Sequence, residues 1–419
     1  MIRQKKRKMR LLKKLVWICV ILLAILVIGV LGFIGYFKWQ SRPLPAHYDT
    51  DYIRTHKDTV QIEIPEMYEL ANIAIAITDY GLENSNAVRK EGEYYERVKN
   101  HFLSHRSHPL ISKIEFSGKQ LFSRYYGFRE NSARYRFDGD RIVLSGIYPT
   151  RWSWFPDIFV DHLTLVEDFA RATRFREFYR DNQSFYEEQI KRYREVVPVK
   201  RMWGWLENQF PERYDSCKVI FSPLIGGSHS TQHCAGEGFR EMIMFVSGPS
   251  FSLDLADEVR EGLLSRVVFT EMDHNYVNPI TWDFWYQVGA AFHRTKRWNR
   301  QSGYRNPPAT FNEYMTWAVF LLYADDVYEK PAFREIRRIT TDIMVKRRKF
   351  IGFEEFSEKL LQLYHNRDEG QRIPDLYPSI LAWAEEVQYQ TPSSQISKEK
   401  TEPSSSQDGV PAGHPAGER

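Results

Sequence analysis

The chain opens with a basic segment that is followed at once by a long uncharged apolar run. Residues 1–14 contain eight lysines and arginines and no acid, and the 23 residues of 15–37 carry no charge. A helix of that length is long enough to cross the roughly 30 Å hydrocarbon core of a bilayer. Because positive charge is retained on the cytoplasmic side, the sequence predicts a basic cytoplasmic segment at 1–14, a transmembrane signal anchor at 15–37 and an outward-facing remainder.

A cleaved signal peptide is the alternative interpretation of this segment. The apolar region of a signal peptide usually has about 7–15 residues and ends at a cleavage site with small residues. No convincing site follows the run, although Pro43-Leu44-Pro45-Ala46 leaves this alternative open. We therefore expect a single-pass protein of the cell inner membrane, with a cytoplasmic N-terminus and a periplasmic main domain.

The charge of the exported part argues against nucleic acid as a partner. The whole chain carries +4 and residues 1–14 carry +8, which leaves about −4 (4 − 8) for residues 15–419. A nucleic-acid-binding domain presents a basic surface instead. The stretch 333–349 is locally basic, and a solvated helix face explains it. The partner that the N-terminal segment predicts is the membrane.

Composition divides the exported part into a tether, a folded region and a tail. We expect a tether at 38–57, a helical N-terminal lobe at 58–210 and a metallopeptidase-like lobe at 211–389. Residues 390–419 are rich in Ser, Pro, Lys, Glu and Gly. Such a segment lacks the apolar side chains that offset the entropy of ordering, so a disordered tail is predicted.

The hydrophobic pattern of both lobes predicts an α+β fold that is rich in helices and has a small sheet. In the first lobe, a short hairpin surrounds the turn Asp138-Gly139-Asp140. Helices of that lobe are expected at 66–78, 93–104, 163–179 and 182–196. The second lobe is expected to contain strands at 216–222 and 241–247, a glycine-rich loop at 226–233, and helices at 254–276 and 311–323. Asn278-Pro279 ends the first of these two helices.

Residues 269–274, Phe-Thr-Glu-Met-Asp-His, look like a zinc-peptidase motif with one ligand missing. In the intact motif, His-Glu-x-x-His, two histidines four residues apart on one helix face bind zinc, and the glutamate polarises the attacking water. Here Thr270 stands at the first histidine position, while Glu271 and His274 are in place. All three share one helix face because His274 follows the other two by three and four residues.

A later helix offers a further ligand. Peptidases of the gluzincin type take their third zinc ligand from an Asn-Glu pair on a downstream helix, and this chain has Asn312-Glu313-x-x-Thr316. Glu313 follows His274 by 39 residues. This arrangement predicts a zincin-like, gluzincin-type lobe with zinc as the cofactor and with His274 and Glu313 as ligands.

Four segments of the exported part carry a family pattern. They are Glu66-Met67-Tyr68-Glu69-Leu70, Tyr94-Tyr95-x-x-Val98-x-x-His101-Phe102, His108-Pro109-Leu110-Ile111 and, most strongly, Glu271-x-x-His274-x-Tyr276-Val277-Asn278-Pro279. On these segments the chain resembles the bacterial domain-of-unknown-function family numbered 4932, best known from Bacteroidota. Several members carry an intact His-Glu-x-x-His before Val-Asn-Pro, so the resemblance implies a metallopeptidase-like ancestry and no particular substrate. This chain departs from that pattern at Thr270.

The threonine leaves zinc one ligand short. A threonine hydroxyl is a poor zinc ligand, and catalytic zinc needs three protein ligands and a water. His229 and His233 in the glycine-rich loop are the candidates that would restore the triad. Glu271 would then be the general base, and Tyr276 would support an oxyanion.

Two other assignments stay open: Glu271 is itself a ligand, or Glu271, His274 and Glu313 form a metal-free polar network. The leading function is a membrane-anchored, outward-facing, metallopeptidase-like hydrolase of unknown substrate. The alternative is a catalytically inactive envelope protein that uses the same cleft to bind a peptide or a glycan. An aromatic platform for either ligand is offered by Trp282, Trp285 and Tyr286.

Three cysteines leave the redox chemistry open. Cys19 lies in the predicted anchor, whereas Cys217 and Cys234 would face an oxidising compartment. A disulfide requires Cα atoms within about 7 Å, a distance that the sequence does not define. Both a bridge and two free thiols are compatible with the sequence.

Overall fold

A mixed five-stranded sheet organises the folded part of the chain. The computed structural model describes residues 16–18, 20–24, 27, 29, 32, 42–148, 157–249, 255–300, 303, 304 and 306–390. The strands are β1 (Leu44–Pro45), β2 (Thr59–Glu63), β5 (Ser216–Ser222), β6 (Ser230–Gly236) and β7 (Phe239–Ser247), in the order β1-β6-β7-β5-β2. Strands β6 and β7 are antiparallel, and the other neighbours are parallel. A separate antiparallel hairpin joins β3 (Tyr135–Asp138) to β4 (Arg141–Leu144).

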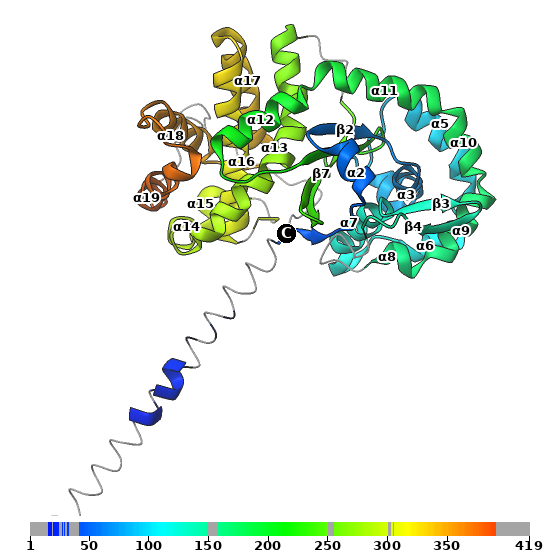
Figure 1. The fold of residues 1–419 in the computed structure, drawn as a ribbon, viewed down its shortest axis with the longest axis horizontal. Helices are drawn as coiled ribbons and strands as arrows, with labels where there is room; N and C mark the ends of the chain where they lie inside the picture. Colours follow the sequence, from blue (N-terminus) through cyan, green and yellow to red (C-terminus); the bar gives the residue numbers. More distant parts are fainter. Residues whose placement is uncertain are drawn as a thin grey trace, which may run out of the picture. The chain divides into compact units, whose positions relative to one another are not determined.

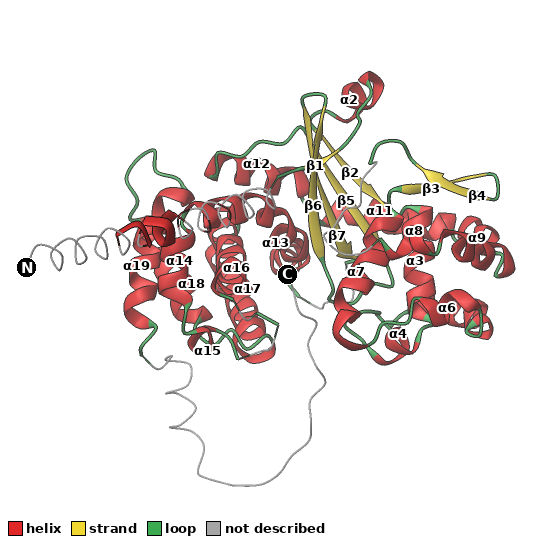
Figure 2. Cartoon of the chain, turned by 90° about the horizontal axis from the view of Figure 1, so that it is seen from below, coloured by secondary structure: helices red, strands yellow, loops and turns green. Residues whose placement is uncertain are grey.

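Strands β5 and β7 are buried along almost their whole length, which explains why each is a nearly continuous apolar run. Successive residues of β5, such as Val219 and Ile220, belong to two different apolar cores because side chains alternate between the faces of a sheet. Figure 2 shows α13 (Asp257–Asp283) on one side of the sheet and α3 (Glu66–Ala76) and α7 (Leu121–Ser132) on the other. Helix α13 packs on β6 and β7, and α3 packs on β5.

The turn between β6 and β7 corrects part of the predicted glycine-rich loop. Glu237 and Gly238 both have positive φ, 50° and 77°, as a two-residue hairpin turn of type I′ requires. The hairpin extends β6 back to Ser230, so the predicted loop at 226–233 ends at His229. His233 therefore lies in a strand and not in a loop.

Short helices surround the first part of the sheet. They are α2 (Thr50–His56), α4 (Asp79–Glu83), α5 (Glu93–Phe102), α6 (Pro109–Lys113), α8 (Ile158–Asp161), α9 (Leu163–Ala172), α10 (Phe175–Asp181), α11 (Gln183–Val196) and α12 (Val199–Gln209), with 3-10 turns at Leu103–His105 and Gly118–Gln120. The helix predicted at 163–179 is two helices, because Arg174 adopts a left-handed conformation with φ of 54° and breaks the hydrogen-bond ladder.

Further helices follow the sheet in the sequence and form a second layer around α13 (Figure 1). They are α14 (Trp285–Phe292), α15 (Thr295–Trp298), α16 (Pro307–Val327), α17 (Lys330–Asp342), α18 (Phe353–His365) and α19 (Tyr377–Val387), with a π-helical turn η3 (Ile343–Arg347) and a 3-10 turn at Ile373–Leu376. Helix α16 packs on α13, α14 and α18. Helix α17 approaches α13 at Gly262, where a Cβ atom would lie 2.4 Å from the Cδ1 atom of Ile336.

Helix α13 continues through Pro279, whereas the sequence predicts its end near residue 276. A proline inside a helix removes the N–H group that would bond the carbonyl four residues earlier. That carbonyl belongs to Asn275, and the hydroxyl of Tyr214 donates a hydrogen bond to it at 3.3 Å. The substitute donor comes from the loop before β5, so no local pattern indicates it. The Thr-Glu-x-x-His segment consequently lies in the middle of α13 and not near its end.

The coarse fold prediction is confirmed: the domain is α+β, rich in helices, with a small sheet. Residues from Pro43 onward form one compact unit. The sheet crosses the predicted lobe boundary at 210/211, because β2 pairs with β5. The predicted tail at 390–419 lies outside the described residues except for Gln390, and most of the predicted anchor at 15–37 lies outside them too. Among the helices that can be described, none is long and apolar enough to cross a membrane.

The structure excludes a disulfide between Cys217 and Cys234. Both thiols are free and buried. Strand β7 separates the two strands, since Cys217 is paired with Met242 and Cys234 with Glu241. Cα atoms two strands apart are roughly 9–10 Å from each other, beyond the reach of a disulfide.

Candidate functional site

The predicted motif residues meet where α13 faces α16. His274 lies on α13, and its Nε2 atom is 3.5 Å from Oε1 of Glu313 on α16. The Nδ1 atom of the same ring is 3.2 Å from Oδ1 of Asn278, one helical turn further along α13. The two residues that the spacing predicts as partners are therefore brought together from segments 39 positions apart.

Thr270 turns its hydroxyl back into its own helix. The Oγ1 atom donates to the carbonyl of Arg266 at 3.0 Å and lies 3.3 Å from that of Val267. A hydroxyl held in this way by helix backbone does not extend toward the Glu313 carboxylate, as an imidazole at that position would. Glu271, the next residue, is buried at the same face of the helix.

Arg348 takes the other oxygen of the Glu313 carboxylate. Its Nη2 atom lies 2.8 Å from Oε2 of Glu313 and donates to the hydroxyl of Tyr304 at 2.6 Å. The side chain of Glu313 is only 4% exposed, so this ion pair is well shielded from water. Glu313 thus bridges an imidazole and a guanidinium.

The carboxylates around His274 keep it charged. Burial alone would lower the pKa of His274, but the hydrogen bond and charge of Glu313, followed by the charges of Glu271 and Asp273, raise it to about 10. His274 is consequently an imidazolium at neutral pH. An imidazolium donates from both ring nitrogens, which matches the acceptor oxygens of Glu313 and Asn278 beside it.

Two arginines share one tryptophan beside this cluster. The guanidinium carbons of Arg266 and Arg348 lie 4.7 Å and 4.8 Å from the ring centre of Trp317, within cation–π distance. Burial, and the charges of Arg348 and Arg347, lower the pKa of Arg266 to about 10. Its Nε and Nη1 atoms are buried and have no hydrogen-bond partner within the described part of the chain. The cluster therefore ends in a protonated arginine that forms no ion pair with an acid of the described residues.

The two loop histidines lie in different places. His229 is half-buried, and its Nε2 atom is 3.1 Å from the hydroxyl of Ser247 at the end of β7. Burial and the charge of Arg129 lower the pKa of His229 to about 3, so it is neutral. His233 lies on β6, with its ring centre 6.3 Å from that of Tyr214. The structure brings neither histidine into contact with His274 or Glu313 through any interaction that it resolves.

Tyr276 lies deep in the core on the side of α13 toward α12. Its ring contacts those of Phe210 and Tyr214, at 5.8 Å and 5.5 Å between centres. The ring is fully buried, and burial, followed by the charge of Glu207, raises the pKa of its hydroxyl well above the ordinary range. This position separates Tyr276 from the Glu313 side of the helix, so its predicted role at an oxyanion has no geometric support.

The structure brings together two of the predicted zinc ligands, His274 and Glu313. Within the described ranges, no group of three or more His, Cys, Asp or Glu side chains is arranged to hold a metal ion. His274 and Glu313 are two donors of the predicted set, and Arg348 competes for the second of them. The sequence interpretation missed Arg348 and Arg266. Arg266 lies four residues before Thr270 and could have been found by helical spacing, whereas nothing local marks Arg348.

Asp273 is a further buried acid that the sequence interpretation did not use. It is fully buried, and neither carboxylate oxygen has a hydrogen-bond partner among the residues described. Burial raises its pKa well above the ordinary value; the charge of His274 opposes the shift, and the charges of Glu271 and Glu313 add to it. Asp273 is thus part of the electrostatic surroundings of His274 without contacting a partner.

No protein-family model matches the chain, and no curated protein and no solved structure is detectably similar to it. The resemblance to family 4932 and the zincin-like interpretation of the lobe therefore stay predictions.

Proposed function

We propose that this protein is a membrane-anchored, outward-facing binding protein of the cell envelope, in which an ion-pair network takes the place of a peptidase metal site. The observation that carries the proposal is the ion pair between Arg348 and Glu313. In a zinc enzyme that carboxylate would balance the charge of the metal. Here the imidazolium of His274 and the guanidinium of Arg348 supply two positive charges to it.

The ligand that this network fits best is a peptide that carries carboxylate groups. Arg266 and Arg348 both lie over Trp317, and Arg266 retains two N–H groups without a partner in the described residues. A carboxylate would satisfy a guanidinium with two parallel hydrogen bonds. The aromatic ring of Trp317 would pack against the apolar part of a peptide side chain.

The test measures binding and metal content on the same preparation. The full chain in detergent is titrated into fluorescein-labelled pentaglutamate and into its pentaglutamine counterpart, with fluorescence anisotropy as the readout. We expect saturable binding of the acidic peptide and a loss of about tenfold in affinity for R266Q. The matched control is R260Q on the same helix, where the guanidinium already pairs with Asp257. Equal binding of both peptides, or an unchanged affinity in R266Q, would contradict the proposal.

A zinc-dependent hydrolase is the second candidate, and one observation favours it. His274 and Glu313 do meet across α13 and α16, as ligands of a gluzincin-type site do. This candidate requires Arg348 to leave Glu313 and His274 to lose a proton. Mass spectrometry of metals in the wild type and in H274A separates the two functions. Near-stoichiometric zinc that is lost in H274A would establish the hydrolase candidate and overturn the binding protein.

A further inference from the structure

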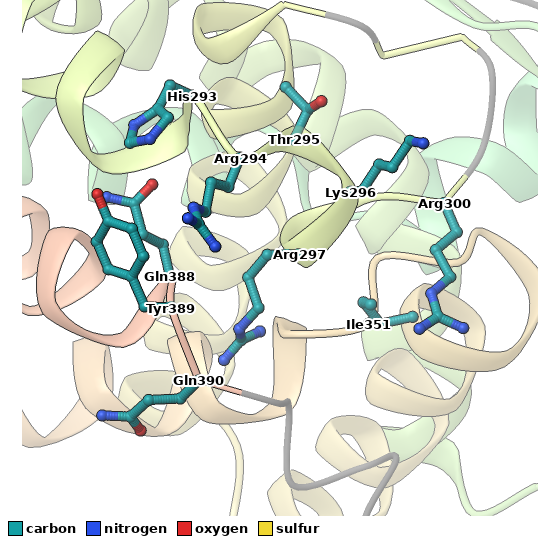
Figure 3. Close-up of a pocket in the computed structure, with 10 residues that line it drawn as sticks. All are labelled: His293, Arg294, Thr295, Lys296, Arg297, Arg300, Ile351, Gln388, Tyr389 and Gln390. Atoms are coloured by element: carbon teal, nitrogen blue, oxygen red, sulfur yellow. The ribbon is translucent and has the colours of Figure 1, made fainter.

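A strongly basic pocket lies beside the last helices of the domain (Figure 3). Its volume is about 590 Å³, within the usual range for small-molecule sites. One wall is formed by residues 293–297 and Arg300 around α15 and another by residues 388–390 after α19, and Ile351 lies beside Arg300 (Figure 3). The pocket is thus built from the ends of three helical segments, held together by the packing of α14 on α19.

Positive charge dominates the lining. Four cationic side chains contribute to it: Arg294, Lys296, Arg297 and Arg300. The acid that pairs with one of them is Glu355, with its Oε2 atom 2.7 Å from Nη2 of Arg297. Within the described residues, no acid contacts Arg294 or Lys296.

Arg297 is the fixed element of this pocket. Its side chain is only 6% exposed, and its guanidinium carbon lies 4.8 Å from the ring centre of Trp298. The backbone at Gly352 passes so close that a Cβ atom there would lie 2.7 Å from Nη1 of Arg297. Nε and Nη1 nonetheless have no hydrogen-bond partner among the described groups. A buried, rigidly packed guanidinium with free N–H groups is a preorganised anion donor.

The opposite wall supplies an acceptor and an aromatic face. Gln388 is buried, and its Nε2 atom donates to the carbonyl of Ala290 at 2.9 Å, while Oε1 has no partner among the described groups. Tyr389 is 59% exposed, and the guanidinium carbon of Arg294 lies 4.2 Å from its ring centre. Figure 3 shows the Arg294 and Arg297 side chains directed to the same side as Tyr389 and Gln390.

We propose that this pocket binds a phosphate monoester, carried either by a free sugar phosphate or by a lipid headgroup. A phosphate offers three oxygens to the N–H groups of Arg294 and Arg297. The hydroxyls of a sugar or glycerol would donate to the free oxygen of Gln388. The exposed ring of Tyr389 suits the apolar face of a sugar ring. Neither the family resemblance nor the His274 cluster enters this inference.

Isothermal titration calorimetry of the full chain in detergent tests it. The probes are glucose 6-phosphate, neutral glucose and the short-chain lipid dihexanoyl phosphatidate. Saturable heat with at least one phosphate monoester and none with glucose is the expected result. A response to glucose 6-phosphate identifies the sugar ester as the source, and a response to phosphatidate identifies the headgroup. Absence of saturable binding for both phosphates would overturn the proposal.

Variants then locate the site. R297Q removes the buried guanidinium, and R294Q is the substitution that leaves the core untouched, because Arg294 is exposed. Each is expected to weaken binding by about tenfold or more, since each removes charged hydrogen bonds to the phosphate. The matched control is R334Q, an exposed arginine on α17 that does not line the pocket. Unchanged affinity in R294Q, or an equal loss in R334Q, would overturn the assignment.

Discussion

The guanidinium of Arg348 forms an ion pair with the carboxylate of Glu313, with 2.8 Å between Nη2 and Oε2. This contact gives Glu313 a partner that a metal would have to displace. It also means that Glu313 is not an isolated buried charge, since His274 and Arg348 neutralise it from both sides.

Restoring the histidine should therefore be insufficient to restore zinc binding. We expect T270H to bind zinc on the order of 10- to 100-fold more weakly than T270H/R348Q, because Arg348 competes for Glu313 in the single variant. Competition of each variant with a chromogenic zinc chelator measures the affinity. R348Q alone serves as the control, since it frees Glu313 without adding a ligand. Equal zinc affinity in the single and double variants would show that Arg348 is no competitor.

Glu69 should make stability depend on pH near neutrality. It is fully buried on α3, where burial raises its pKa to about 7 against the weaker opposing effect of a hydrogen bond from Tyr94. The folded state therefore binds a proton more tightly than the unfolded state, so the stabilisation is complete below pH 4.5 and is lost as pH rises through 7. Between pH 4.5 and 8, we expect the unfolding free energy of the wild type to fall by about 3 kcal/mol relative to that of E69Q. Urea unfolding of both proteins from pH 4.5 to 8 checks this.

The sequence predicted the strand at 216–222 with its correct ends, because a continuous apolar run before Pro223 is a local signal. It placed 59–63 at the start of a helical lobe, although these residues form β2. A five-residue strand of mixed polarity is stabilised by pairing with β5, whose partner residues lie more than 150 positions away. Pairing of that kind leaves no trace in the local pattern.

In the candidate site, too, some features follow from local sequence and others depend on distant contacts. His274 and Glu313 were predictable because helical spacing and chain distance constrain both. Arg348 was not, because it follows a π-helical turn whose geometry decides where the side chain reaches. The continuation of α13 through Pro279 depends on the distant hydroxyl of Tyr214. Arg348 and the end of α13 depend on tertiary contacts and were not predictable, whereas Arg266 follows the helical spacing of α13 and was predictable but missed.

Asp273 should lower the unfolding free energy at neutral pH. Its pKa is raised by burial, so the folded state favours the protonated form, and the associated stability is lost as pH rises above the ordinary pKa of an aspartate, about 3.9. D273N keeps the shape and removes the charge. We expect it to raise the unfolding free energy at pH 7 by about 1–3 kcal/mol, with a smaller gain at pH 4. Thermal unfolding at both pH values measures this, and a loss of stability at pH 7 would indicate a partner for the carboxylate.

The thiols of Cys217 and Cys234 should stay reduced after export. Both are fully buried on different strands, and burial raises the pKa of each thiol above its ordinary value. Thiolate is the reactive form, so both should resist alkylation in the folded protein. Mass spectrometry after iodoacetamide treatment, with and without urea, provides the measurement. A mass two hydrogens lower before reduction, with no labelling of Cys217 or Cys234 in urea, would reveal the disulfide that the strand order excludes.

Glu241 and Lys218 form the buried ion pair on which we expect stability to depend most. Glu241 is fully buried on β7, 3.7 Å from Nζ of Lys218, and it accepts hydrogen bonds from Tyr52 at 2.8 Å and Ser216 at 3.0 Å. Lys218 is itself only 8% exposed and donates to the hydroxyls of Tyr52 and Tyr148. Burial would lower the pKa of Lys218, but Glu241 raises it above its ordinary value, so Lys218 is charged.

Removing one charge of this pair leaves the other buried without compensation, so E241Q should lower the unfolding free energy by about 3–5 kcal/mol. The double variant E241Q/K218M should recover part of that loss, because it buries no unpaired charge. E335Q breaks an exposed pair with Arg338 and should change stability by less than about 1 kcal/mol. Urea unfolding of the four proteins at pH 7 gives the comparison. A double variant that is less stable than E241Q would mean that Lys218 stabilises the sheet through its tyrosine contacts and not through its charge.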